Sequence, residues 1–229
     1  MRTHIRALIL LCFTIAVHAN FSIEPATITI RIDRGENSAW LDVVHTGGTR
    51  PVAVELGVFE RNLDMDGDLI RDPMKPSSDF VVHPAQIILQ PGEQARVQVV
   101  YAGRQRGAVD KAYILLSQEV PLPLDEEGEG VRVGIRTLMN YYTVLAVSTG
   151  KPGRLTFVSS KAIGDGKVEV IVENKSGGRV PVNRLTVNVG REKIENVTVG
   201  RNSIMPGQQR RLVFEYGRAV TAKEVTFGF

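Results

Sequence analysis

Acidic side chains gather at one point of the sequence in a spacing that could bind a cation. Asp64, Asp66 and Asp68 alternate around Gly67, and Ca²⁺ prefers carboxylate oxygens as ligands. An EF-hand loop needs its Gly after the third acidic position and a Glu at position twelve. Here Gly67 comes too early, and position twelve is Lys75. The pattern therefore favours a polar hairpin turn around Asp66 and Gly67 over a calcium site.

Other residue types that carry chemistry are sparse. The acidic run 125–129 has no basic residue directly beside it and indicates a solvated loop rather than a carboxylate site. His45 and His83 are the two histidines after residue 19, and the single cysteine is Cys12, so a four-ligand zinc site is not expected. His83 precedes a Pro at the start of a strand, and a surface or packing role is expected. No nucleophile elbow or Gly-rich phosphate loop occurs, so the sequence predicts no enzyme, no cofactor and no metal.

The first 19 residues have the features of a secretory signal peptide. Arg2 and Arg6 form a positive start, and residues 7–17 form an apolar run that is too short for a membrane-spanning helix of about 20 residues. We expect cleavage after Ala19, which leaves 210 of the 229 residues. Because both arginines are removed, the formal net charge falls from +3 to +1. Cys12 is removed as well, so the mature protein is expected to have neither a thiol nor a disulfide.

Composition places the mature chain among folded, exported proteins. Hydrophobic residues make up 43% of the full chain and charged residues 23%, as in ordinary globular domains. The basic residues are dispersed among acidic ones, whereas a nucleic-acid binder usually shows a clustered basic patch. No later segment is long and apolar enough to span a membrane. The sequence therefore predicts neither a nucleic-acid partner nor an integral membrane segment in the mature chain.

Short runs rich in Val, Ile and Thr alternate with turn residues, and no helical period persists. Within residues 26–32, Ile28, Ile30 and Ile32 occupy one face of an expected strand. Strands this frequent, separated by Gly, Pro and Asp, indicate antiparallel β-sandwiches. The first series of expected strands covers residues 26–32, 40–44, 52–59, 80–89, 95–101, 112–120 and 131–147.

The strand pattern is interrupted at residues 148–153, which read Ser-Thr-Gly-Lys-Pro-Gly and form the best candidate for a linker. We therefore expect an all-β protein with a larger sandwich domain at residues 20–147 and a smaller one at residues 154–229. The second series of expected strands covers residues 155–158, 167–173, 184–189, 195–199, 210–216 and 224–227.

One expected strand is unusual. Val131, Val133 and Ile135 alternate with polar or small residues and would form an apolar stripe. From the pattern alone, such a stripe is first of all the core face of a strand. The segment continues to residue 147, however, which is far longer than the usual strand of about five or six residues. An overhanging apolar edge favours pairing with another chain, and in an exported protein this suggests that the strand is donated to a client.

The chain resembles the periplasmic chaperones of chaperone–usher pili, the PapD-like family. The resemblance follows the order of motifs along the mature chain and is weaker in the second domain. Its most recognisable stretch is similar to the family's F-x-V-x-P … L-x-P-G-x segment. The matching segments are residues 21–25 (first strand), 80–84 with 89–94 (the stretch just named), 113 with 119–121 (Y … E-[IV]-P), 131–142 (donor strand), and 173–176, 205–207 and 225–227 in the second domain.

The resemblance implies two immunoglobulin-like domains arranged as a boomerang with a cleft between them. It implies a non-enzymatic chaperone that binds pilus subunits by donor-strand complementation and delivers them to an outer-membrane usher. Such a subunit lacks its last strand, so a donated strand fills its apolar groove and pairs its free backbone groups. By this resemblance, the inserted side chains are Val131, Val133 and Ile135. The resemblance also allows the free chaperone to cap its donor strand by dimerising.

One pair of positions departs from the family. Its members typically bind the subunit's terminal carboxylate with an Arg on the first strand and a Lys late on the donor strand. The matching positions are Thr27 and Asn140, which are neutral and offer no charge-assisted hydrogen bond. Arg31 and Arg136 are the nearest basic residues on the two strands. Each is either a relocated carboxylate anchor or a solvent-facing strand charge.

Other classes of function compete with this interpretation. A structural pilus subunit would be a single incomplete domain, often with a disulfide, whereas this chain has two strand series. An exported carbohydrate-binding sandwich would present exposed aromatic side chains, and aromatic residues make up only 6% of the chain. A secreted hydrolase would need a catalytic constellation, which the sequence does not contain.

Overall fold

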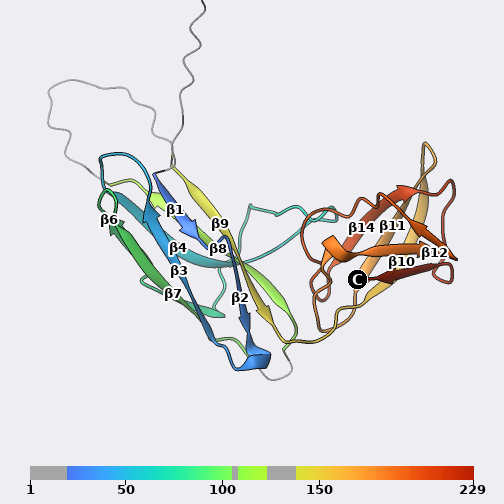
Figure 1. Cartoon of the computed structure of the whole chain (residues 1–229), viewed down its shortest axis with the longest axis horizontal. Coiled ribbons are helices and arrows are strands. Elements are labelled where there is room, and N and C mark those ends of the chain that lie inside the picture. Colours follow the sequence, from blue (N-terminus) through green and yellow to red (C-terminus); the bar gives the residue numbers. More distant parts are fainter. Residues whose placement is uncertain (1–19, 105–107, 123–137) are drawn as a thin grey trace, which may run out of the picture.

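A computed structural model describes residues 20–104, 108–122 and 138–229. The described residues form two groups of strands, joined by a short connection (Figure 1). We call β1–β9 the first domain and β10–β15 the second domain. The first domain contains β1 (Phe21–Glu24), β2 (Thr27–Arg31), β3 (Ser38–His45), β4 (Val52–Glu60), β5 (Phe80–His83), β6 (Gln86–Leu89), β7 (Gln94–Tyr101), β8 (Lys111–Val120) and β9 (Asn140–Ser148). The second contains β10 (Leu155–Gly164), β11 (Lys167–Asn174), β12 (Thr186–Val189), β13 (Glu192–Ile194), β14 (Gln209–Glu215) and β15 (Val225–Gly228).

Each domain has two sheets. In the first domain one sheet has the order β1-β3-β7-β5 and the other has the order β2-β9-β8-β4-β6. In the second domain the orders are β10-β11-β14 and β13-β12-β15. Neighbouring strands are antiparallel except β2 and β9, which run parallel. The all-β class and the two sandwich domains are as the sequence predicts.

Side chains that alternate along the strands fill each sandwich. In β2, Ile28 and Ile30 are buried while Thr27 and Thr29 on the opposite face are exposed. In β11, Val168 and Val170 are fully buried in a second, separate core. Burying a side chain of this size contributes about 1.5–3 kcal/mol. Each domain therefore has a hydrophobic core of its own.

The expected strand over residues 80–89 is wrong. It consists of two strands in different sheets, because β5 ends at His83 and pairs with β7 whereas β6 begins at Gln86 and pairs with β4. Pro84 lies at the break and has no N–H group to donate to a ladder. The expected strand over residues 195–199 is also wrong. The strand β13 lies just before this range and ends at Ile194. Within the range, Thr198 forms only an isolated bridge.

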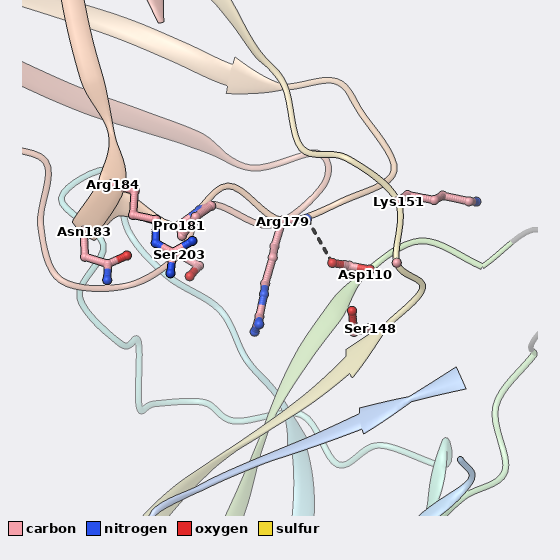
Figure 2. Close-up of a pocket in the computed structure, with 9 residues that line it drawn as sticks. Asp110, Ser148, Lys151, Arg179, Pro181, Asn183, Arg184 and Ser203 are labelled. Atoms are coloured by element: carbon pink, nitrogen blue, oxygen red, sulfur yellow. Dashed lines mark hydrogen bonds between the residues drawn. The ribbon is translucent and has the colours of Figure 1, made fainter. Parts of the chain in front are cut away.

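A buried carboxylate joins the two domains. Asp110, just before β8, is 4% exposed. It accepts hydrogen bonds from the N–H and the hydroxyl of Thr149 in the connection. It also accepts one from the N–H of Arg179 in the second domain (Figure 2). Its own N–H donates to the carbonyl of Gly177, at 2.8 Å. The Nζ of Lys151 reaches back to the carbonyl of Ala108, at 2.5 Å. Three segments of the chain thus meet at one side chain.

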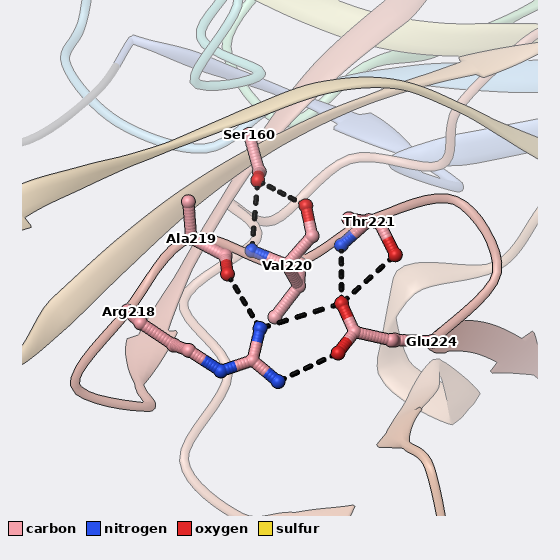
Figure 3. Close-up of polar contacts among 6 residues, drawn as sticks. All are labelled: Ser160, Arg218, Ala219, Val220, Thr221 and Glu224. Atoms are coloured by element: carbon pink, nitrogen blue, oxygen red, sulfur yellow. Dashed lines mark hydrogen bonds and ion pairs between the residues drawn. The ribbon is translucent and has the colours of Figure 1, made fainter.

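A second polar cluster fixes the last loop, residues 217–224 (Figure 3). Arg218 donates to both carboxylate oxygens of Glu224, and Thr221 donates to Glu224 through its N–H and its hydroxyl. The hydroxyl of Ser160 bonds to the N–H and the carbonyl of Val220, which ties the loop to β10. Hydrogen bonds from the side chain of Arg218, and to a smaller extent from Thr221, lower the pKa of Glu224 from 4.5 to about 2.

We predict that Asp110→Ala destabilises the protein by at least about 2 kcal/mol, because three hydrogen bonds to a charged, buried acceptor are lost. Urea unfolding followed by fluorescence measures this loss. Asp42→Ala removes a carboxylate from a surface ion pair with Arg96 and is the control, with an expected change below about 1 kcal/mol. Equal effects of the two changes would contradict the role given to Asp110.

We also predict that Glu224→Gln lowers the melting temperature at neutral pH. Because the pKa of Glu224 is depressed in the folded state, its stabilising effect is present above pH about 4.5 and declines as the pH falls toward about 2. The difference in melting temperature between wild type and variant should therefore shrink over that range. Glu215→Gln, an exposed carboxylate on β14, is the control. A difference that stays constant down to pH about 2 would contradict the prediction.

Candidate functional site

The residues expected to enter a client lie outside the described part of the chain. Val131, Val133, Ile135 and Arg136 belong to residues 123–137, as does the acidic run 125–129. The expected continuous strand over residues 131–147 is not observed at Leu138 and Met139, because β9 begins at Asn140. There the N–H of Met139 donates to the side chain of Glu119, at 3.3 Å, instead of to a backbone carbonyl.

The first half of β9 has an open edge. On one side, residues 140–147 pair with β8. On the other side, β2 pairs only with residues 144–148. Within the described residues, no strand covers the outer edge of β9 between Asn140 and Thr143. This edge leads directly back toward residues 131–137, so an unpaired strand edge lies where the sequence predicts strand donation.

Thr27 and Asn140 are not brought together. Thr27 lies opposite Val144 in the parallel ladder, and Asn140 precedes Val144 by four residues, which is about 13 Å along a strand. Both are exposed. The position across from Thr27 is therefore apolar, and these two neutral residues do not form one polar site.

Arg31 is at the end of the first domain that adjoins the connection to the second domain. It is paired with Ser148 at the end of the β2–β9 ladder. Its Nη2 is 3.5 Å from a carboxylate oxygen of Asp33, and its Nε is buried without a hydrogen-bond partner. Ser148 lines a cavity of about 460 Å³ between the two domains. Arg31 thus has hydrogen-bonding capacity left, and its ladder partner Ser148 belongs to the lining of this cavity.

The cavity is positively charged (Figure 2). Lys151, Arg179 and Arg184 line it, with Asp110 as the one carboxylate among its lining residues. Asp110 already accepts three hydrogen bonds. The guanidinium groups of Arg179 and Arg184 form no hydrogen bond or ion pair with any residue that the structure describes. Among the described residues, two cations of the cavity lining are therefore left without a partner, and no local pattern in the sequence signals this grouping.

A further cation lies over β9. The guanidinium of Arg71 stacks on the ring of Tyr142, with 4.8 Å between its central carbon and the ring centroid. Tyr141 packs against the core, so Tyr142, the next residue, faces outward. Arg71 belongs to the loop between β4 and β5, residues 61–79, which crosses from the first to the second domain (Figure 1). The sequence pattern around Arg71 does not indicate this position.

The three spaced carboxylates form a hairpin turn, as expected. A bridge between Leu63 and Leu69 closes the hairpin. One oxygen of Asp64 accepts the N–H groups of Asp66 and Asp68, both at 2.9 Å. Hydrogen bonds from these backbone groups, foremost that of Asp68, lower the pKa of Asp64. Hydrogen bonds within the hairpin therefore define the turn.

The two histidines have structural positions. His45 is 5% exposed, and its Nε2 lies 3.0 Å from the carbonyl of Arg50. His83 is exposed at the end of β5. Across residues 20–104, 108–122 and 138–229, no three His, Cys, Asp or Glu side chains are grouped so that they could hold a metal ion. In the same residues, no helix is long and apolar enough to cross a membrane.

Comparison with known proteins gives a clear result for structure. No family model matches the sequence, and no curated protein is similar to it in sequence. The fold is similar to a chain in the chaperone–tip adhesin complex of CFA/I fimbriae, with a TM-score of 0.61 and 12% identity over 92% of this chain and 98% of that one. It is also similar to the class 5 fimbriae chaperone CfaA (TM-score 0.59, 12% identity, 91% and 98% covered).

A third similar structure is the CsuC–CsuE complex of the archaic chaperone–usher Csu pili of Acinetobacter baumannii. Here the TM-score is 0.56 and the identity 14%, over 91% of this chain and 92% of that one. In each case the similarity extends through both domains. The chain therefore has the two-domain, immunoglobulin-like fold of the periplasmic chaperones of chaperone–usher pili.

Proposed function

We propose that this protein is a periplasmic chaperone that holds pilus subunits by donor-strand complementation and passes them to an outer-membrane usher. The observation that carries the proposal is the open edge of β9 between Asn140 and Thr143. The alternating segment from Val131 to Ile135 lies immediately before that edge in the sequence. Together they provide unpaired backbone groups and apolar side chains, which are the two things that an incomplete sandwich lacks.

The similar structures support this function. One is a complex of a chaperone with a tip adhesin, and another is a pre-assembly complex of a chaperone with a tip adhesion subunit. The absence of a catalytic constellation from the sequence is consistent with a binding role. We therefore propose an incompletely folded pilus subunit as the client and an usher as the recipient, with no catalytic step.

The proposed compartment follows from the first 19 residues. We propose that they are a signal peptide cleaved after Ala19, and a similar structure is described as a periplasmic chaperone. We also propose that residues 20–147 and 154–229 are the two domains and residues 148–153 the linker. The two hydrophobic cores support this division, since one uses residues from 21 to 147 and the other residues from 155 to 225.

We predict that Ile135→Asp abolishes co-purification of the chaperone with pilus subunits. A carboxylate cannot enter an apolar groove without a large desolvation penalty. Arg132→Asp introduces the same side chain on the opposite face of the segment and is the matched control, with subunit binding retained. Circular dichroism verifies that both variants are folded. Subunit binding by folded Ile135→Asp would refute the assignment of the donor strand.

The client's terminal carboxylate needs a cation, and Thr27 and Asn140 cannot supply one. We propose that Arg31 and Arg136 share this role, with Thr27 and Asn140 offering at most neutral hydrogen bonds. The unpartnered Nε of Arg31 supports the proposal, as does the cavity lined by Arg179, Arg184 and Ser148, the last of which is the ladder partner of Arg31. A carboxylate that reaches this region would find several donors and little competing negative charge.

We predict that Arg31→Ala and Arg136→Ala each weaken subunit binding by about 10- to 100-fold, the equivalent of one charge-assisted hydrogen bond. Titration of a labelled subunit measures the affinity. Arg34→Ala, which removes an exposed charge at the end of the helix that follows β2, is the control. If Arg31→Ala and Arg136→Ala bind as tightly as Arg34→Ala, neither arginine is the anchor.

A further inference from the structure

The tip of the β4–β5 loop, residues 61–79, forms hydrogen bonds with the other domain. Asp66 lies 3.1 Å from Nη1 of Arg211 through both carboxylate oxygens. The side-chain amide of Asn202 donates to the carbonyl of Gly67, at 2.7 Å, and the N–H of Arg211 donates to the carbonyl of Met65, at 2.8 Å. Backbone and side-chain bonds from β14 and the preceding loop thus hold the tip of a first-domain hairpin.

The same contact encloses a buried cation. Arg210 is fully buried, and its Nη1 donates to the carbonyls of Val199 and Asn202, at 3.0 Å each. Its Nε and Nη2 have no hydrogen-bond partner. Burial lowers the pKa of Arg210, and the carboxylates of Asp64, Asp66 and Asp68 oppose that shift. The hairpin therefore brings the negative charge that makes a buried guanidinium tolerable.

The fit between the two surfaces is close. A methyl group at Gly67 would collide with the guanidinium of Arg210, and one at Gly200 would collide with the carbonyl of Asp66. Both glycines have positive φ, at +85° and +75°. Close packing of this kind holds one arrangement of the two domains, whereas a contact made only of exposed ion pairs would contribute little.

We propose that the β4–β5 loop is an interdomain strap, which fixes the angle between the two domains before any client binds. Asp110 joins the domains at the connection, and the strap joins them at a second place. Two separate attachments restrain rotation that a single joint would permit. The consequence for client affinity rests on the proposed chaperone function, whereas the fixed angle does not.

Spin labels on the two domains test the strap. With Cys12→Ser, the exposed positions Gln94→Cys and Glu192→Cys carry the labels, and double electron–electron resonance gives the distribution of distances between them. Gly200→Ala should broaden the distribution. Gly207→Ala is the matched control, because Gly207 has a similar φ of +80° in the same domain and no atom near its added methyl group. Identical distributions for the two variants would overturn the proposal.

Hydrogen exchange tests the strap in the wild-type protein and does not depend on a glycine variant that folds. The Arg211 amide has its acceptor, the carbonyl of Met65, in the other domain. It should be protected in wild type and exchange at least about tenfold faster in Asp66→Ala/Asn202→Ala, as the loss of a hydrogen bond predicts. Fast exchange of this amide in the wild type would refute the strap. Weaker client binding by the double variant would link the strap to the proposed function. If the distance distribution broadens but client binding is unchanged, the strap still fixes the interdomain angle, and only its role in client binding is overturned.

Discussion

The arrangement of the two domains depends on the buried carboxylate of Asp110. A carboxylate removed from water is costly unless hydrogen bonds replace its hydration. Here the donors come from the connection and from the second domain, so the carboxylate is satisfied only when all three segments are in place. Asp110 is also the one carboxylate among the residues that line the basic cavity, and its hydrogen bonds come from Thr149 and from the backbone of Arg179. The guanidinium groups of Arg179 and Arg184 form no ion pair with it.

The open edge of β9 results from a feature near the start of the first domain's sequence. The chain leaves one sheet after β1 and enters the other at β2. Pro25 lies between the two strands and cannot donate to either ladder. β2 therefore starts late and covers only the second half of β9. A change of sheet near the N-terminus thus leaves backbone groups unpaired more than a hundred residues later, next to the segment that the sequence singles out.

Local patterns in the sequence predicted most of the strands, because alternation between Val or Ile and polar residues reflects burial on one face. The turn of Asp64, Asp66 and Asp68 was also predicted correctly, because its hydrogen bonds join residues that are close in sequence. The split of residues 80–89 was missed, although Pro84 carried the signal. The docking of Gly67 against Arg210, the stacking of Arg71 on Tyr142 and the basic cavity could not be predicted. Each joins residues distant in sequence, and no short-range pattern encodes such pairs.

The contact of Asp66 with Arg211 also has a consequence for the order of folding. These residues are 145 positions apart, so the ends of a very long loop must meet before the contact forms. The core of the first domain uses residues up to Val147 and is complete in sequence before β14 has been made. Because the chain is made from its N-terminus, the first sandwich can close while its hairpin still lacks a partner. Assembly of the two domains therefore ends with the arrival of the C-terminal strands, and until then the contact of Asp66 with Arg211 cannot form.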